Sequence, residues 1–245
     1  MNLVGRSLVG FLSLMLFGLS LLSCDGDNDK GVTPTTIPAA PSTSIALHSA
    51  DDPGSSFIII LTTVSGATGY RLYESDDGTT YSEVIGTNIE TMGSFGYALQ
   101  TSATDKYFHV RAYNTAGESE PGPVIFAEPD NYSSSGNFIT APADGATGVS
   151  LTPLIELSAV TGASKYALSV YTTGEGGSDI WNVLLSDGKT SVSYGDTQPN
   201  VETFVNSTSL ANNSLYGVTV EAVNANNWGY LKDDNTFTTA GGGGL

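Results

Sequence analysis

The chain has 245 residues, enough for two domains of about a hundred residues each. Its 25 acidic residues against 8 basic ones give a formal charge of −17, which argues against nucleic acid and anionic lipid headgroups as partners. The single cysteine, Cys24, excludes an internal disulfide, so each domain must be held together by its core alone.

The first 23 residues have the pattern of a targeting segment. Arg6 is followed by an apolar run from Leu8 to Leu22, which is short for a transmembrane span. The run ends in Leu21-Leu22-Ser23-Cys24, which resembles the bacterial lipoprotein signal. The resemblance implies cleavage before Cys24, lipid attachment to that residue and a place in the bacterial cell envelope, on the periplasmic or the surface-exposed side. An ordinary secretory peptide is the alternative.

Residues 24–37 are expected to form a flexible acidic tether. The run from Asp25 to Gly31 has the acidic character of a calcium loop, but its spacing fails. Lys30 occupies the position that needs glycine, and Thr36 stands where the twelfth-position glutamate belongs. Prolines 34, 38 and 41 favour extended backbone beyond it.

From residue 38 onward the composition is that of an all-β protein. Short runs of Val, Ile, Tyr and Thr alternate with clusters of Gly, Asn, Asp and Pro. One stretch occurs twice: the segment from Val64 to Leu72 is matched, 96 residues later, by the segment from Val160 to Leu168. A period near one hundred residues indicates two copies of one small domain.

The first domain is expected over residues 38–128. Strands are predicted at residues 57–62, 70–74, 81–85 and 107–114, with a Gly78 turn between the second and the third. The Gly-Ala-Thr-Gly-Tyr entry at 66–70 and the Tyr-Phe-x-Val-Arg-Ala-Tyr-Asn strand at 107–114 resemble a fibronectin type III domain. The segment departs from that family at Leu61, where the family has tryptophan, and at Lys106, where it has the tyrosine-corner residue.

Residues 129–137 read as a polar linker, and residues 138–240 as a second fibronectin type III or Ig-like domain. Tyr216 follows Leu210 by six residues, and the resemblance implies a tyrosine corner whose hydroxyl bonds nearby backbone. The second copy is about 14 residues longer, and we expect the extra residues in loops at 174–178 and 200–203. Residues 241–245 form a glycine-rich tail.

The sequence predicts no catalytic residues, metal ligands or cofactor. His48 and His109 lie far apart, and neither metal-ligand spacing nor a nucleophile elbow occurs. A glycosidase uses a pair of carboxylates that meet in space. Acidic residues are plentiful in this chain, but nothing in the sequence selects such a pair.

Alternation along two strands predicts one candidate binding face. Phe108, Val110 and Ala112 should face the core of the first domain, as should Tyr70 and Leu72. The outward set is then Arg71, Tyr73, Tyr107, His109, Arg111 and Tyr113. Such a set forms either a self-satisfied ladder of cross-strand pairs or a docking face for an acidic or polyhydroxylated partner.

Trp228 and Tyr230 form a second candidate site of ligand contact, in the loop expected between the last two strands. These aromatics either stack on a ligand or fold back to cap the core.

The function that fits best is a lipid-anchored, non-catalytic binding or adhesion module with a protein or glycan ligand. A structural spacer or envelope-assembly component without a ligand is the alternative. A carbohydrate-active accessory protein or enzyme is a weaker one.

Overall fold

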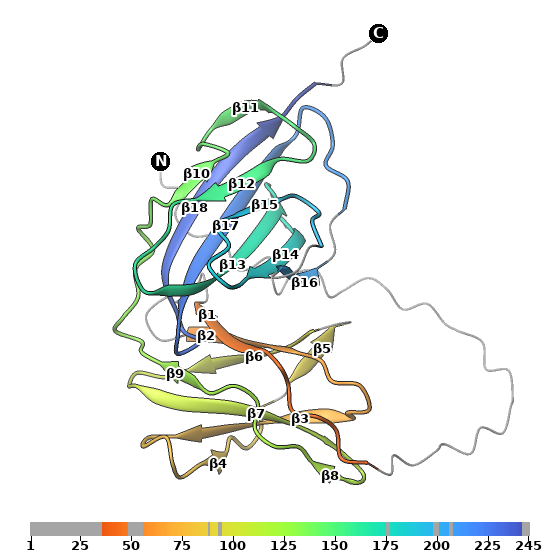
Figure 1. Ribbon diagram of the computed structural model, residues 1–245, viewed down its shortest axis with the longest axis vertical. Coiled ribbons are helices and arrows are strands. Elements are labelled where there is room, and N and C mark those ends of the chain that lie inside the picture. Colours follow the sequence, from red (N-terminus) through yellow and green to blue (C-terminus); the bar gives the residue numbers. More distant parts are fainter. Residues whose placement is uncertain are drawn as a thin grey trace, which may run out of the picture.

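The computed structural model describes residues 36–48, 56–87, 89–92, 95–174, 177–197, 201–205 and 208–241. Their regular structure is entirely β, in two sandwiches that stack one above the other (Figure 1). The all-β class and the sandwich architecture predicted from the sequence are therefore confirmed. The signal segment and Cys24 lie outside the described residues.

The first sandwich has two antiparallel sheets. One has the order β1-β2-β6-β5, and its strands are β1 (Ser44–His48), β2 (Ser56–Thr62), β5 (Glu90–Met92) and β6 (Phe95–Thr101). The other has the order β4-β3-β7-β8, with β9 also paired to β7, and its strands are β3 (Gly69–Ser75), β4 (Ser82–Glu83), β7 (Lys106–Asn114), β8 (Gly117–Glu118) and β9 (Ile125–Ala127).

The second sandwich pairs a small sheet with a large one. The small sheet has the order β10-β12-β15, formed by β10 (Ile139–Ala141), β12 (Leu154–Leu157) and β15 (Ser191–Ser193). The large sheet has the order β11-β18-β17-β13-β14-β16, formed by β11 (Ala146–Val149), β13 (Ala163–Thr172), β14 (Asp179–Leu185), β16 (Val201–Val205), β17 (Leu215–Asn224) and β18 (Gly229–Thr239).

The repeated sequence stretch has the same local structure in both sandwiches. The backbone N–H of Val64 donates to the hydroxyl of Tyr70 (2.6 Å), and that of Val160 donates to the hydroxyl of Tyr166 (2.8 Å). The intervening Gly66 has a φ of 77°, a backbone conformation that favours glycine. The valine, the glycine and the tyrosine recur together because one turn needs all three.

Two expectations for the second sandwich have opposite outcomes. The tyrosine corner is confirmed, since the N–H of Ala211 donates to the hydroxyl of Tyr216 at 2.8 Å. The loop expected at 200–203 is wrong, because Val201–Val205 forms strand β16 at the edge of the large sheet. Its β-branched and aromatic residues favour a strand, and Phe204 buries its ring between the sandwiches.

The two sandwiches share an apolar interface. Ile45, Leu47, Ile58 and Ile60 point away from the core of the first sandwich and pack against the large sheet of the second. The residues that meet them there are Ala167, Leu184, Phe204 and Val223. Strand β2 is thus covered on both faces, which explains why Phe57 to Leu61 reads as a continuous apolar run rather than an alternating one.

The β17–β18 turn extends this interface into the first sandwich, and Figure 1 shows the lower end of that hairpin meeting β1 and β2. The N–H of Ala46 donates to the carbonyl of Asn227 at 2.9 Å. His48 Nδ1 lies 2.8 Å from a carboxylate oxygen of Glu221, and both side chains are almost fully buried. Polar and apolar contacts together join the two sandwiches.

Candidate functional site

The candidate face is built on the antiparallel pair β3 and β7. Their register sets Arg71 beside Arg111 and Tyr73 beside His109. Tyr70 and Leu72 face the core together with Phe108, Val110 and Ala112, as alternation predicts. The sequence therefore predicts correctly which side chains lie on the outer face.

His109 lies on this face but is not exposed, which corrects the expectation of an open surface residue. Its exposed fraction is 4% because aromatic rings cover it. Tyr73 stacks on its ring at 5.2 Å, and Tyr81 packs against it at 4.3 Å. Burial, and then the nearby positive charge of Arg111, lower the pKa of His109 to about 4. At neutral pH the imidazole is uncharged.

The two arginines of the face have different surroundings. Arg71 lies 3.6 Å from Glu83 and 3.4 Å from Glu118, and its guanidinium carbon is 4.9 Å from the centre of the Tyr113 ring. The carboxylate of Glu83 is the main cause of the raised pKa of Arg71. The positive charge of Arg71 is therefore offset by acidic neighbours.

Arg111 is held by neutral groups. Its Nη1 donates to the carbonyl of Ser119 at 2.9 Å, and its Nε donates to Nε2 of His109 at 3.4 Å. Its guanidinium carbon lies 5.6 Å from the centre of the Tyr73 ring. The uncharged His109 serves as an acceptor that fixes the guanidinium in place.

A hollow of about 380 Å³ opens on this face. Its lining consists of Tyr73, Thr79, Tyr81, His109, Arg111 and Glu118. Glu118 comes from β8 and accepts hydrogen bonds from the hydroxyl of Tyr73 at 3.0 Å on each of its two oxygens. The volume is within the range of small-molecule sites, about 300–1,000 Å³.

A rigid turn presents the outer wall of the hollow. Oδ1 of Asp77 accepts hydrogen bonds from the N–H groups of Thr79 and Thr80, both at 2.8 Å, and from the hydroxyl of Ser75. These bonds, led by those from the backbone, hold the pKa of Asp77 far below its ordinary value. Gly78 completes the turn with a φ of 70°. Thr79 and Tyr81 follow directly.

Sequence reasoning missed Thr79, Tyr81 and Glu118. Strand alternation assigns a face only within a strand, whereas these residues come from a turn, the residue before β4 and a two-residue strand. The predicted Tyr107 and Tyr113 do not line the hollow: Tyr107 stacks on Phe126 at 4.5 Å, and Tyr113 lies against the backbone of Gly69.

The prediction of a ligand contact at Trp228 is wrong. Trp228 is fully buried in the core of the first sandwich, with its ring 5.1 Å from Phe57 and 4.5 Å from His48. It does cap a core, but that of the neighbouring sandwich. Tyr230, partly buried, donates its hydroxyl to the carbonyl of Thr161 at 2.8 Å and packs against both cores.

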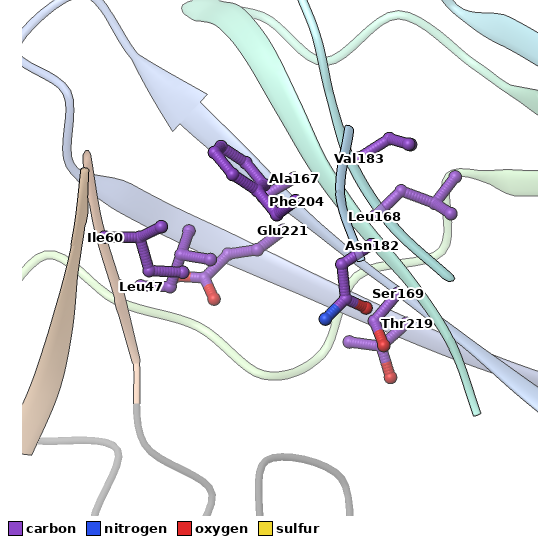
Figure 2. A pocket seen from close by; sticks show the side chains of 10 residues that line it. All are labelled: Leu47, Ile60, Ala167, Leu168, Ser169, Asn182, Val183, Phe204, Thr219 and Glu221. Atoms are coloured by element: carbon purple, nitrogen blue, oxygen red, sulfur yellow. The ribbon is translucent and has the colours of Figure 1, made fainter. Parts of the chain in front are cut away.

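A narrow groove also lies between the sandwiches. Figure 2 shows Leu47 and Ile60 on one side of it, and Ser169, Asn182 and Thr219 from the large sheet on the other. Its free space is about 20 Å³, close to what a single water molecule needs. We therefore take the groove as a packing feature of the interface and the hollow as the candidate site.

Within the described ranges, no three His, Cys, Asp or Glu residues come together in a way that suits a metal ion. The same residues contain no helix that is long and apolar enough to cross a membrane.

Comparison with known proteins gives structural neighbours only. No family model matches the chain, and no curated protein matches it. Among solved structures it is similar to the chicken CNTN1 FN1–FN3 domains, with 14% identity, a TM-score of 0.28 and coverage of 84% of this chain and 68% of that one. It is also similar to a chimeric titin Z1Z2 carrying an exogenous peptide from decorin, with 10% identity, a TM-score of 0.27 and coverage of 86% of this chain and 100% of that one. The sandwich architecture itself rests on the strand pairing described above.

Proposed function

We propose that this protein is a lipid-anchored bacterial envelope protein that binds a partner non-catalytically through the β3–β7 face. Acyl chains on Cys24 hold it to a membrane, and the tether carries the sandwiches away from that surface. Each buried methylene of an acyl chain contributes about 0.8 kcal/mol, so two or three chains give lasting anchorage. The resemblance of residues 21–24 to a lipoprotein signal supports the anchor.

The hollow beside Arg111 is the observation that carries the binding role. It combines aromatic rings with a guanidinium and a carboxylate, whose positions are set by hydrogen bonds within the sheet. Groups already held in place lose little conformational entropy when a partner binds. A surface ladder of cross-strand pairs requires no such concavity.

A spacer without a ligand is the second candidate, and the apolar interface favours it. Ile58, Ile60 and Phe204 are buried between the sandwiches, and Trp228 closes the core of its neighbour. Contacts of this kind hold two domains at a fixed angle, as a spacer requires.

Binding to an array of oligosaccharides and of envelope and host surface proteins separates the two candidates. With residues 25–245 as the probe, we expect binding that is lost in the Arg71→Ala, Arg111→Ala double variant. The melting temperature should stay within a few degrees, because both side chains lie on the outer face. Lys189→Ala, which removes a positive charge from a turn of the second sandwich, serves as the control and should bind normally. Absence of any bound partner would favour the spacer.

A further inference from the structure

We infer that the hollow on the β3–β7 face binds a neutral sugar residue of a glycan. The inference rests on the proposed binding function and names the class of ligand for the same site. It follows from the hydrogen-bonding groups that the hollow leaves unused, from its charges and from its aromatic wall.

The lining offers unused donors and acceptors side by side. Within the described part of the chain, Nη2 of Arg111 and the hydroxyl of Tyr81 have no hydrogen-bond partner. On Glu118, Oε1 accepts from Tyr73 and Arg71, whereas Oε2 accepts from Tyr73 alone. A carboxylate oxygen has two lone pairs, so one acceptor position on Oε2 is left. Sugar hydroxyls both donate and accept, and they match such a mixed set.

The charges of the lining disfavour ionic ligands. An anion that approaches Arg111 also meets the carboxylate of Glu118, on a protein with a formal charge of −17. A cation that approaches the Tyr73 ring meets the guanidinium of Arg111, which already lies 5.6 Å from the ring centre. His109 adds no charge at neutral pH. A neutral ligand avoids both repulsions, and hydrogen bonds to a charged group are stronger than those between neutral groups.

Tyr81 supplies the apolar contact. Its ring is partly exposed, lines the hollow and packs against His109, which limits its rotation. A tyrosine ring presents an apolar surface with a polar tip, which suits the C–H face and the hydroxyl edge of a sugar ring. The hydrogen-bonded turn at Asp77 holds the neighbouring Thr79 in place.

The test uses residues 25–245 on an array of neutral, sialylated and sulfated oligosaccharides, with a parallel array of surface proteins. We expect the strongest signals on neutral oligosaccharides. In a calorimetric titration with the best of them, Tyr81→Ala and Arg111→Gln should each weaken binding by about tenfold or more. Tyr113→Ala and Arg71→Gln remove the same kinds of side chain from the same face but outside the hollow, and they should weaken it by less.

Tyr81→Phe keeps the ring and removes only the hydroxyl, so an intermediate loss is expected if the variant folds normally. Signals confined to sialylated or sulfated sugars, or unchanged binding by Tyr81→Ala and Arg111→Gln, would overturn the sugar assignment. Binding to a protein alone would also overturn it, while leaving the proposed binding function intact. No binding on either array would overturn both.

Discussion

His109 shows how a polar residue on an outer face is buried by its own neighbours. Two tyrosine rings cover it, and Arg111 donates to its Nε2. Burial favours the uncharged imidazole because it disfavours the charged form. Arg111 has the same effect, because a proton on Nε2 would break the hydrogen bond and place two positive charges together. The histidine is therefore a fixed acceptor within the hollow.

The titration of His109 tests this account. We expect a pKa of about 4, against an ordinary value of 6.5, from an NMR titration of the imidazole. As the pH falls, the unfolded chain takes up this proton before the folded one does. The stabilising effect of the neutral side chain is therefore complete above pH 6.5 and is lost progressively between pH 6.5 and about 4.

Urea unfolding at pH 7 and pH 4.5 measures the effect on stability. The wild type should lose more unfolding free energy over this interval than His109→Gln, in which the titrating group is absent. The variant also controls for protonation of carboxylates elsewhere in the chain. Equal losses in the two proteins would contradict a buried neutral His109.

At the scale of elements, the β17–β18 turn joins the two sandwiches. It belongs to the second sandwich by chain connectivity, yet its Trp228 side chain lies among Phe57, Phe108 and Ile125 of the first. Removing a buried tryptophan side chain costs about 3–5 kcal/mol, since it loses burial and leaves a cavity. The cost here falls on a sandwich that does not contain the mutated residue.

We therefore expect Trp228→Ala to destabilise the first sandwich selectively. Hydrogen exchange followed by mass spectrometry should show faster exchange in β1, β2 and β7, with β12 and β13 nearly unchanged. Trp181→Ala is the matched control, because Trp181 is equally buried but lies in the core of the second sandwich. It should produce the opposite pattern. Faster exchange in β12 and β13 alone after Trp228→Ala would refute the shared core.

Local pattern was enough to predict β2, β3 and β7 and the orientation of β3 and β7. The alternation of Phe108, Val110 and Ala112 with polar neighbours predicts which face of β7 is buried. The destination of Trp228 was not predictable in this way, because a turn residue shows no alternation and its contacts with Ala46 and Phe57 span more than 170 positions. The hollow was only half predicted, since Tyr81 and Glu118 reach it from outside the two strands that pattern assigns.

At the scale of the whole molecule, the proposed anchor, the tether and the two sandwiches follow one another along the chain. The first sandwich follows the tether and carries the hollow, and the second lies beyond it in sequence. The acidic surface disfavours close approach to anionic lipids, so the anchorage that we propose would depend on Cys24 and not on the folded surface.

Metabolic labelling with a palmitate analogue in a bacterial host tests the anchor. The wild type should be labelled, and Cys24→Ser should abolish the signal, because Cys24 is the only thiol of the chain. Ser23→Ala keeps a small residue before the cysteine and should be labelled like the wild type. Labelling that persists in Cys24→Ser would refute lipidation at this residue.

Because Trp228 of the second sandwich completes the core of the first, it also determines when the first sandwich can finish folding during synthesis. Chains are made from the N-terminus at about 5–20 residues per second, and domains generally fold as they emerge. The last strand of the first sandwich ends at Ala127, so 101 further residues (228 − 127) are added before Trp228 exists. For roughly 5–20 seconds at those rates the nascent first sandwich has an open core end, with Phe57 beneath it. A chaperone that engages apolar surface has its opportunity in that interval, which ends when Trp228 packs over Phe57.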